Sequence, residues 1–232
     1  MSSTKTEFAV NMTCDNCVKA VKESLSSPYV HIVDIDLKKN SVIVESSLST
    51  TELIQKIETS GKKVVLKGIG ETSAGVAILE AGKPEIKGVV RFVQLQNSCI
   101  VDGTVDGLKP GKYQLTVHEN GDISNGCDSC GDTFNPNDLK MGLEEKRYGE
   151  LGEIRALSNG RSSFRLENNI VKLRDLIGRS LVISQINNNR EQRYTCGIIA
   201  RSAGLFQNPK TICACSGASI WDETIDPKKA SL

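Results

Sequence analysis

The sequence predicts a multidomain protein, in which an α+β domain is followed by an all-β domain and a short irregular tail. Three observations predict this architecture. The chain has 232 residues, a length more typical of two domains than of one. Residues 5–67 mix strand-like and helical hydrophobic periodicity, whereas residues 74–201 show only strand-like runs. Strand patterning then stops, so the expected domains are 1–72, 73–202 and 203–232.

The first domain alternates strands and helices in the order β-α-β-β-α-β. Apolar residues recur at helical spacing within residues 15–26, with Asp15 as the expected N-cap. Ser49 or Thr50 is expected to cap a second helix, which stops at Gly61. This order defines the ferredoxin-like, split βαβ unit. Its strands are expected at residues 6–12, 30–37, 41–46 and 63–68.

The second domain shows alternating strand-like runs separated by Gly-rich turns, after a linker near residues 68–73. Many short strands of this kind favour a sandwich or a closed barrel. A long loop, at about residues 119–148, interrupts the pattern, and a loop of that length in a compact domain is usually functional. The clearest strands are expected at residues 74–80, 86–96, 99–105, 112–119, 152–157 and 178–184.

Composition excludes several classes of function. The net charge is +1, from 29 basic and 28 acidic residues, which argues against nucleic acid or an anionic membrane as the main partner. No apolar run approaches the roughly 20 residues of a membrane helix. The sequence "MSSTKTEFAV" at the N-terminus has no apolar signal core, so we expect a cytoplasmic protein.

Cysteine and histidine indicate the chemistry. Cysteines in a cytosolic chain usually serve metal or redox chemistry rather than a disulfide framework. The only two histidines, His31 and His118, exclude a site that needs several imidazoles. There are eight cysteines, six of them in close pairs: Cys14 and Cys17, Cys127 and Cys130, Cys213 and Cys215, with Cys99 and Cys196 outside the pairs.

In the first pair, Cys14 lies in the loop before the helix expected at residues 15–26, and Cys17 lies in the first turn of that helix. The partial positive charge of a helix N-terminus favours thiolates. Two thiolates from one loop suit a soft cation of low coordination number, and Cu(I) is the soft choice. Zinc prefers four ligands, but a zinc site or a redox C-x-x-C motif remains an alternative.

Residues 1–67, with the motif "MTCDNC", resemble the heavy-metal-associated domains of soluble copper chaperones. The resemblance implies that Cys14 and Cys17 bind one Cu(I) and hand it to a partner through shared thiolate coordination. It also implies that Lys62 or Lys63, in "SGKKV", offsets the negative charge of the bis-thiolate complex. The alternative for these lysines is a solvated turn.

The middle domain resembles the copper–zinc superoxide dismutases. The stretches that carry the resemblance are "HENGDISNGCDSCGDTFNP", "GELGEI", "GRSLVIS" and "RYTCGIIA". The resemblance implies an eight-stranded Greek-key barrel. It also implies a disulfide between Cys127 in the long loop and Cys196 in the last strand.

Departures from the dismutase pattern decide what this domain does. Of the metal-binding histidines only His118 remains, and we expect it to be a leftover strand residue. One imidazole cannot build a copper redox centre, so neither dismutase activity nor zinc in the barrel is expected, and Arg193 has no substrate to steer. The family's other histidine positions hold Thr116, Thr133, Ser184 and, approximately, Arg147.

Two further cysteines have simple expected roles. Cys130 forms a second C-x-x-C motif with Cys127. A zinc site that joins this motif to Cys14 and Cys17 would require the two domains to lock face to face, and we do not expect it. Cys99 is expected to be a small core residue of a strand.

Dismutases of this family dimerise through the loop before the disulfide and the end of the last strand. The matching residues here are 121–126 and 197–200, with Gly197, Ile198 and Ile199 as docking residues. Because a twofold interface is self-complementary, a near copy of one subunit can replace the other. The barrel would then dock with a dismutase monomer. The alternative is an inert scaffold between two metal-binding segments.

The tail contains Cys213-Ala214-Cys215. Alternate residues of an extended segment point to the same side, so both sulfurs can bind one Cu(I). The same pair can close a small, strained and therefore oxidising disulfide. Two incidental cysteines are the alternative. The stretch "RSAGLFQNPKTICACSGASIWDE" resembles the tail of the family of copper chaperones for superoxide dismutase, so the resemblance covers essentially the whole chain.

This family resemblance implies a metallochaperone rather than an enzyme. It implies a heterodimer with copper–zinc superoxide dismutase, copper delivery to the apo-enzyme, and formation of that enzyme's intrasubunit disulfide. Cys213 and Cys215 would carry the copper relay and the disulfide transfer. A free-standing thiol oxidoreductase and a thiol-based copper storage protein are the competing interpretations. The sequence leaves open whether the free protein is a homodimer.

Overall fold

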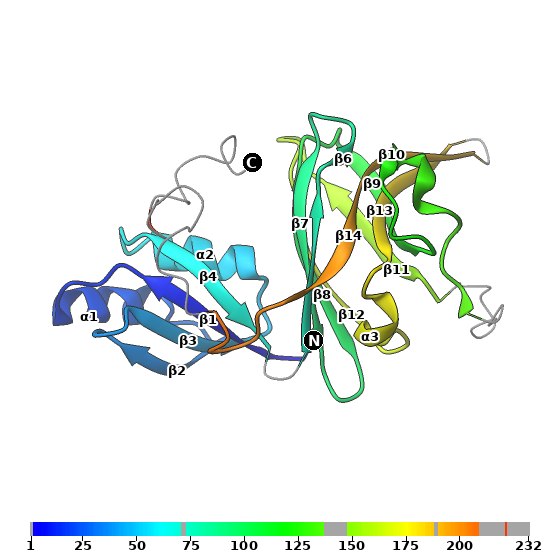
Figure 1. Ribbon diagram of the computed structural model, residues 1–232. Helices are drawn as coiled ribbons and strands as arrows, with labels where there is room; N and C mark the ends of the chain where they lie inside the picture. The colour runs from blue at the N-terminus through cyan, green and yellow to red at the C-terminus, as the bar shows by residue number, and fades with distance from the viewer. Residues whose placement is uncertain (1, 71–72, 137–147, 188–189, 209–220, 222–232) are drawn as a thin grey trace. The chain divides into compact units, whose positions relative to one another are not determined.

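The computed structural model describes residues 2–70, 73–136, 148–187, 190–208 and Trp221 (Figure 1). The chain divides into two compact units, one comprising Met1–Glu71 with Ala203–Leu232, the other Thr72–Ser202. Among the described residues, no helix is long and apolar enough to cross a membrane.

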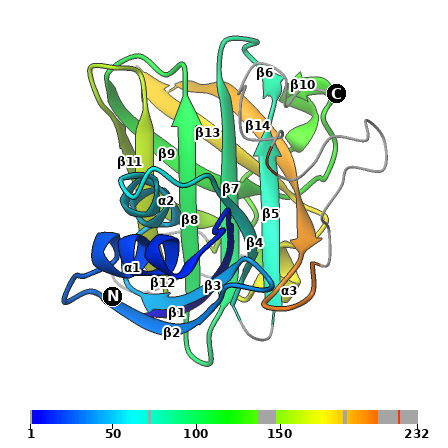
Figure 2. The same ribbon diagram turned by 90° about the vertical axis from the view of Figure 1, so that its left-hand side faces the viewer.

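The first unit contains the predicted β-α-β-β-α-β arrangement. Its strands form one antiparallel sheet in the order β2-β3-β1-β4. Both helices lie on the same side of this sheet (Figure 2). The ferredoxin-like prediction is therefore confirmed. The elements are β1 (Thr4–Val10), α1 (Asp15–Ser24), β2 (Val30–Asp36), β3 (Ser41–Ser46), α2 (Thr50–Glu58) and β4 (Val64–Ile69).

Local sequence explains where the two helices begin. Ser49 caps α2 through a reciprocal capping box with Glu52, in which the side chain of each residue binds the other's backbone N–H. The predicted N-cap of α1 was wrong, because Cys14 occupies the cap position and Asp15 is the first helical residue. Asp15 still places its negative charge in the first helical turn, where the helix dipole favours it.

The second unit is a nearly closed barrel of eight main strands, in the order β11-β9-β13-β14-β5-β7-β8-β12. The first and last strands of this path, β11 and β12, contact each other. Although β9 follows β8 in the chain, it does not pair with β8 and lies between β11 and β13. Such a connection between strands that are not neighbours is what the predicted Greek-key topology requires. The main strands are β5 (Ser73–Leu79), β7 (Lys87–Gln94), β8 (Cys99–Asp106), β9 (Gly111–His118), β11 (Glu150–Ala156), β12 (Ser162–Asn168), β13 (Ser180–Asn187) and β14 (Arg190–Ser202).

Smaller elements lie between the main strands. They are β6 (Ala81–Gly82), which pairs with β14, β10 (Ser124–Cys127), the short 3-10 helix η1 (Asp128–Cys130) and α3 (Leu173–Leu176). The long loop predicted at residues 119–148 thus contains β10 and η1 in its described part. Strand β12 was not among the strands expected from sequence, because only Phe164 and Leu166 mark its apolar alternation.

The barrel interior is a continuous apolar core that includes Phe92, Tyr113 and Leu115. Cys99 is fully buried in this core, and burial raises the pKa of its thiol to about 12. A thiol that stays protonated and inaccessible is neither a nucleophile nor a metal ligand at neutral pH. The structure thus gives Cys99 the place expected of a core residue.

Candidate metal, thiol and docking sites

The loop before α1 brings the first thiol pair together. Cys14 is the N-cap of α1, and Cys17 lies in its first turn. Their sulfur atoms are 3.3 Å apart, and the side chain of Cys14 is exposed while that of Cys17 is buried. The two sulfurs are therefore close enough for both to be ligands of one small soft cation.

Two neighbouring turns hold this loop in place. The carbonyl oxygen of Asn40 accepts the Val10 N–H (2.8 Å), and its side-chain oxygen accepts the Met12 N–H (2.9 Å). The carbonyl of Lys63 accepts the Asn11 N–H (3.0 Å), so the turn of Lys62 and Lys63 adjoins the loop. Asn40 has a left-handed φ of 52°, which asparagine tolerates better than most residues.

Hydrogen bonds to sulfur make Cys17 acidic. The backbone and the hydroxyl of Thr13, together with the Cys14 thiol, lower the pKa of Cys17 to about 6, although burial acts in the opposite direction. Thr13 Oγ1 lies 3.5 Å from Cys17 Sγ. Cys17 is therefore mostly a thiolate at neutral pH, which is the state that binds a soft metal. The contribution of Thr13 was not recognised from sequence.

This acidity predicts a measurable pH profile. In the metal-free, reduced protein, alkylation of Cys17 should be half-maximal near pH 6, and Thr13→Val should shift the midpoint upward by roughly one unit because a hydrogen bond to the thiolate is lost. Because the folded pKa is lowered, any stability gained from this ionisation is lost as pH falls through about 6. Mass spectrometry of peptide 13–19 after pulsed alkylation measures the midpoint. A midpoint near the ordinary thiol value in the unaltered protein would contradict the assignment.

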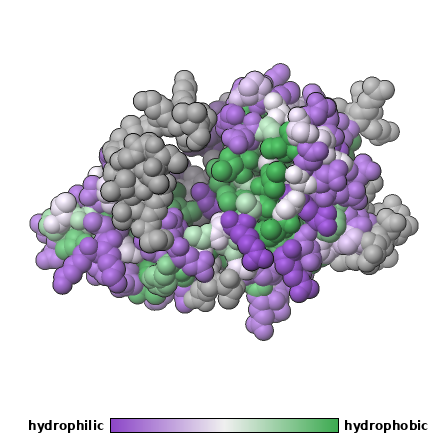
Figure 3. Space-filling model, in the orientation of Figure 1, coloured by the Kyte–Doolittle hydropathy of each residue, from purple (hydrophilic) through white to green (hydrophobic). Residues whose placement is uncertain are grey.

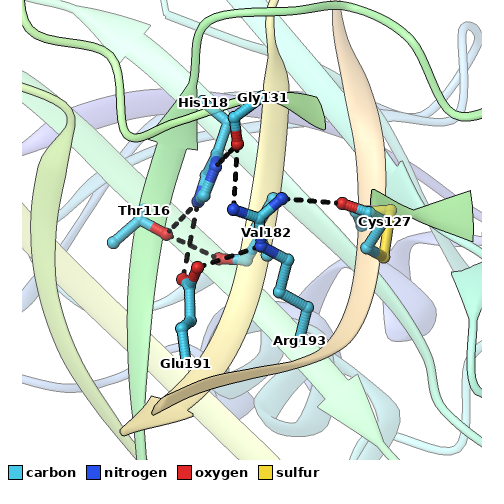
Figure 4. A network of polar contacts seen from close by, with 8 residues as sticks. Thr116, His118, Cys127, Gly131, Val182, Glu191 and Arg193 are labelled. Atoms are coloured by element: carbon cyan, nitrogen blue, oxygen red, sulfur yellow. Dashed lines mark hydrogen bonds and ion pairs between the residues drawn. A yellow bond between two sulfur atoms is a disulfide. The ribbon is translucent and has the colours of Figure 1, made fainter. Parts of the chain in front are cut away.

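In the barrel, Thr116 and His118, at two of the dismutase metal positions, belong to a polar network with Glu191 and Arg193 (Figure 4). His118 is fully buried, with its Nδ1 at 2.9 Å from the Gly131 carbonyl oxygen and its Nε2 at 3.0 Å from Thr116 Oγ1. Glu191 Oε1 lies 3.7 Å from the same Nε2. Thr133 forms an isolated antiparallel β-bridge with His118. Both imidazole nitrogens thus have protein partners.

Arg193 ties this network to the loop that follows β10. Its guanidinium donates to the carbonyl oxygens of Cys127 and Gly131, each at 2.9 Å, and to Glu191 Oε2 at 2.9 Å. The three bonds leave this guanidinium directed at protein atoms rather than at an open cavity. The observed contacts of Arg193 are therefore structural.

The contacts and burial of the network set the protonation states of His118 and Glu191. Burial and the charge of Arg193 lower the pKa of His118, so the imidazole is neutral at physiological pH. Burial opposes ionisation of Glu191, but hydrogen bonds from Arg193 and Ser184 outweigh it and lower the pKa of the carboxyl. In the described part of the chain, no three His, Cys, Asp or Glu side chains gather to hold a metal ion. Arg147 lies outside the described residues.

Cys127 and Cys196 form a disulfide, the pairing implied by the dismutase resemblance, with their Cα atoms 5.7 Å apart. It lies in a buried cluster with Cys130 and Val182. Burial raises the pKa of Cys130, so its thiol stays protonated. Since Cys127 is in a disulfide, it cannot serve as a thiolate ligand in a zinc site shared with Cys14 and Cys17.

The three expected docking residues differ in exposure. Ile198 presents its side chain to solvent, with 38% of its surface exposed. Ile199 is fully buried in the barrel core. Gly197 has no room for a side chain, because a Cβ there would collide with the carbonyl oxygen of Ile78. Of the three, only Ile198 offers its side chain to a partner.

Around Ile198, apolar side chains form a patch on the outside of the barrel. On β5, Ile78 is exposed and Val76 is partly exposed, and on β7 Val89 is partly exposed. These side chains alternate along their strands with the core residues Ala77 and Val90, so they lie on the outer face of the barrel. Figure 3 shows apolar residues gathered on this face of the barrel. We call Val76, Ile78, Val89, Ile198 and Ala200 the outer patch.

The tail cysteines Cys213 and Cys215 lie outside the described residues. Of the other segment expected to dock, residues 121–126, most side chains are exposed, and Ile123 packs partly against the disulfide cluster.

The fold and these sites define the class of protein: a heavy-metal-associated domain joined to a dismutase-like barrel that keeps one histidine at the dismutase metal positions. Family models agree. Residues 7–63 match the heavy-metal-associated domain, and residues 86–202 match copper/zinc superoxide dismutase. The crystal structure of the clock protein EA4 aligns with a TM-score of 0.50 at 30% identity, covering 56% of this chain and 97% of that one.

Whole-chain relatives then identify the family. Copper chaperones for superoxide dismutase from Mus musculus and Homo sapiens are 45% and 44% identical, each over 94% of this chain and 88% of the relative. The superoxide dismutase 1 copper chaperone of Saccharomyces cerevisiae is 32% identical over 94% of this chain and 93% of its own. The chain belongs to the family of copper chaperones for superoxide dismutase. These relatives are named as chaperones and not as enzymes.

Proposed function

We propose that this protein binds Cu(I) through Cys14 and Cys17, docks with apo copper–zinc superoxide dismutase as a heterodimer, delivers the copper, and promotes formation of the target's intrasubunit disulfide. It acts in the cytoplasm, and its barrel takes no zinc. One observation carries the proposal: a thiol pair with sulfurs 3.3 Å apart belongs to the same chain as a dismutase barrel in which one histidine remains at the metal positions.

The metal-binding step is supported by the chemistry of the pair. Cys17 is mostly a thiolate at neutral pH, and Cys14 is exposed to solvent. Two soft sulfur ligands on one loop suit Cu(I) and leave its remaining coordination positions free. An incoming thiolate from a partner can therefore share the ion before the loop releases it.

The docking step is supported by the outer patch. Its side chains come from three neighbouring strands, and their pairing places Ile78 opposite Val89 and Val76 opposite Ala200. An apolar surface made by adjacent strands can bury well against a matching sheet surface. A dismutase subunit supplies such a surface if the barrel of this protein takes the place of the second subunit in a dismutase dimer. The same surface would serve a homodimer of the free protein.

The proposal is tested by mixing copper-loaded protein with reduced, zinc-loaded apo-dismutase. Dismutase activity and the target's thiol state are followed together. Ile198→Glu should weaken the complex by more than about 100-fold, because an unpaired charge buried at an interface costs several kcal/mol. Activation should fall in parallel, while the copper content of the chaperone stays unchanged.

The matched control is Ile186→Glu, which places the same charge on a well-exposed isoleucine of β13. It should leave the complex and activation intact. An intact complex with Ile198→Glu would show that the barrel recognises its partner by another surface. Gly197 is unsuitable for this test, since any side chain there would disrupt the pairing of β14 with β5. Copper uptake with no effect on dismutase would favour copper storage.

A further inference from the structure

Glu7 is a buried carboxylate in the middle of β1, with 2% of its surface exposed. It alternates along the strand with Phe8, whose side chain packs under the helices, so Glu7 points to the opposite face of the sheet. A buried carboxylate is costly unless charges and hydrogen bonds satisfy it. Its partners therefore indicate why the residue is there.

Two partners belong to the same sheet. Lys67 Nζ lies 3.0 Å from Glu7 Oε1, and the Ser41 hydroxyl donates to the same oxygen at 3.4 Å. The third partner comes from the far end of the chain: the backbone N–H of Phe206 donates to Glu7 Oε2 at 2.7 Å. The second carboxylate oxygen is thus used to hold a segment 199 residues away in sequence.

That segment, residues 203–208, follows the last barrel strand and belongs to the same compact unit as β1–β4 (Figure 1). We call it the return segment. The Leu205 N–H donates to the Gly70 carbonyl at 3.0 Å, and the Asn208 side chain donates to the Lys67 carbonyl at 3.3 Å. The backbone of Gly204 lies so close to Gly68 that a Cβ on Gly68 would collide with the Gly204 carbonyl oxygen.

The return segment adopts a conformation that it would not choose alone. Phe206 has a left-handed φ of 62°, which is unfavourable for a bulky residue, and the residue is 74% exposed. The ring therefore gains little from burial, and the contacts of the backbone must hold the turn. The bond from Phe206 to Glu7 is the one contact among these that involves a charged acceptor, and such bonds are stronger than neutral ones.

We propose that Glu7 is a positioning residue that holds the return segment on the metal-binding domain, so that the chain toward Cys213 and Cys215 starts beside the domain that carries Cys14 and Cys17. Five positions separate Asn208 from Cys213, a span of at most about 18 Å. Anchoring the segment raises the effective concentration of the tail near that domain. This role rests on the proposed function of the tail in copper relay and disulfide transfer.

Three variants of the full-length protein test the anchor itself. Glu7→Gln removes the charge but keeps the shape, and Gly68→Ala blocks the seat of Gly204 without changing charge. Either should speed hydrogen exchange at the Leu205 and Phe206 amides at least tenfold. Phe206→Gly keeps the N–H and relieves the left-handed strain, so exchange should slow about fivefold. Glu58→Gln, the same change at an exposed site of α2, should have no effect.

Amides of β3 serve as the internal reference for a folded domain, because β3 lies inside the sheet. Rapid exchange at Phe206 in the unaltered protein, with β3 protected, would overturn the anchor. The anchor would also be overturned if the Leu205 and Phe206 amides of Glu7→Gln exchanged at the same rate as those of the unaltered protein. If Glu7→Gln also speeds hydrogen exchange at the β3 amides, the domain itself is destabilised. The Gly68→Ala variant then decides whether the anchor exists, since it leaves the Glu7–Lys67 pair in place.

The positioning role is tested by the rate at which protein loaded with Cu(I) at Cys14 and Cys17 activates reduced, zinc-loaded apo-dismutase. Glu7→Gln and Gly68→Ala should slow this rate about tenfold, with copper stoichiometry and affinity for dismutase unchanged. A normal rate in a variant whose return segment is released would overturn the positioning role. If the unaltered protein fails to activate dismutase, the proposed function fails instead, and the exchange data alone decide whether the anchor exists.

Discussion

Copper binding at the N-terminal domain should fall from about one Cu(I) per chain to none when Cys14 and Cys17 are both changed to serine, because a hydroxyl is a poor ligand for a soft cation. The experiment uses full-length protein that already carries Cys213→Ser and Cys215→Ser, so that the tail cannot bind copper. Competition with a chromophoric Cu(I) chelator under anaerobic conditions measures the stoichiometry. X-ray absorption of the parent protein should show only sulfur neighbours.

The remaining cysteines should not compensate. Burial raises the pKa of Cys99 and of Cys130, and Cys127 and Cys196 are joined in a disulfide. Cys99→Ser is the matched control and should leave the stoichiometry unchanged. Nitrogen neighbours around copper, or a Cys14→Ser/Cys17→Ser protein that still binds one tightly held Cu(I), would contradict the assignment.

The second large effect is expected from the tail. Cys213→Ser/Cys215→Ser should leave the complex with dismutase intact but reduce disulfide formation in the target by at least about tenfold, and activation with it. In the proposed step, a target thiolate attacks the Cys213–Cys215 disulfide and forms a mixed disulfide. The second target thiolate then displaces the tail, which leaves as a dithiol. The tail disulfide is the two-electron oxidant, so the assay supplies it pre-oxidised.

Other thiols of the chain are poor candidates for this exchange. Cys99 and Cys130 are buried and protonated, and the Cys127–Cys196 disulfide lies in a buried cluster. Cys14 and Cys17 are the serious rivals, because Cys14 is exposed and Cys17 is acidic. A trapped intermolecular disulfide should map to Cys213 or Cys215. If it maps to Cys14, or if the tail variant oxidises its target at the normal rate, the tail is not the exchanging element.

The sequence by itself determined the order of the domains and the proximity of Cys14 and Cys17 in one loop. Strand and helix periodicities differ enough that the β-α-β-β-α-β unit and the barrel could be told apart, and two cysteines three positions apart in one loop must lie close together. The shortage of histidines for a dismutase metal site was also evident from the sequence, because residues of one type can be counted without knowledge of the fold. Strand β12 was missed, since two apolar residues give too weak an alternation.

Only the tertiary structure decided which of the expected docking residues can touch a partner. Gly197, Ile198 and Ile199 are consecutive, and alternation alone does not say which side of a strand faces the core. Closure of the barrel buries Ile199 and exposes Ile198, while the neighbouring β5 leaves no space at Gly197.

The acidity of Cys17 and the anchoring of residues 203–208 likewise came from the fold. Thr13 lowers the pKa of Cys17 through hydrogen bonds that depend on the loop conformation. Asn40 holds that loop from a turn that is distant in sequence but adjacent in space. Glu7 and Phe206 are 199 positions apart, and neither residue type signals its partner. Local periodicity reports which residues share a face of one element, whereas contacts between distant segments follow only from how those elements pack.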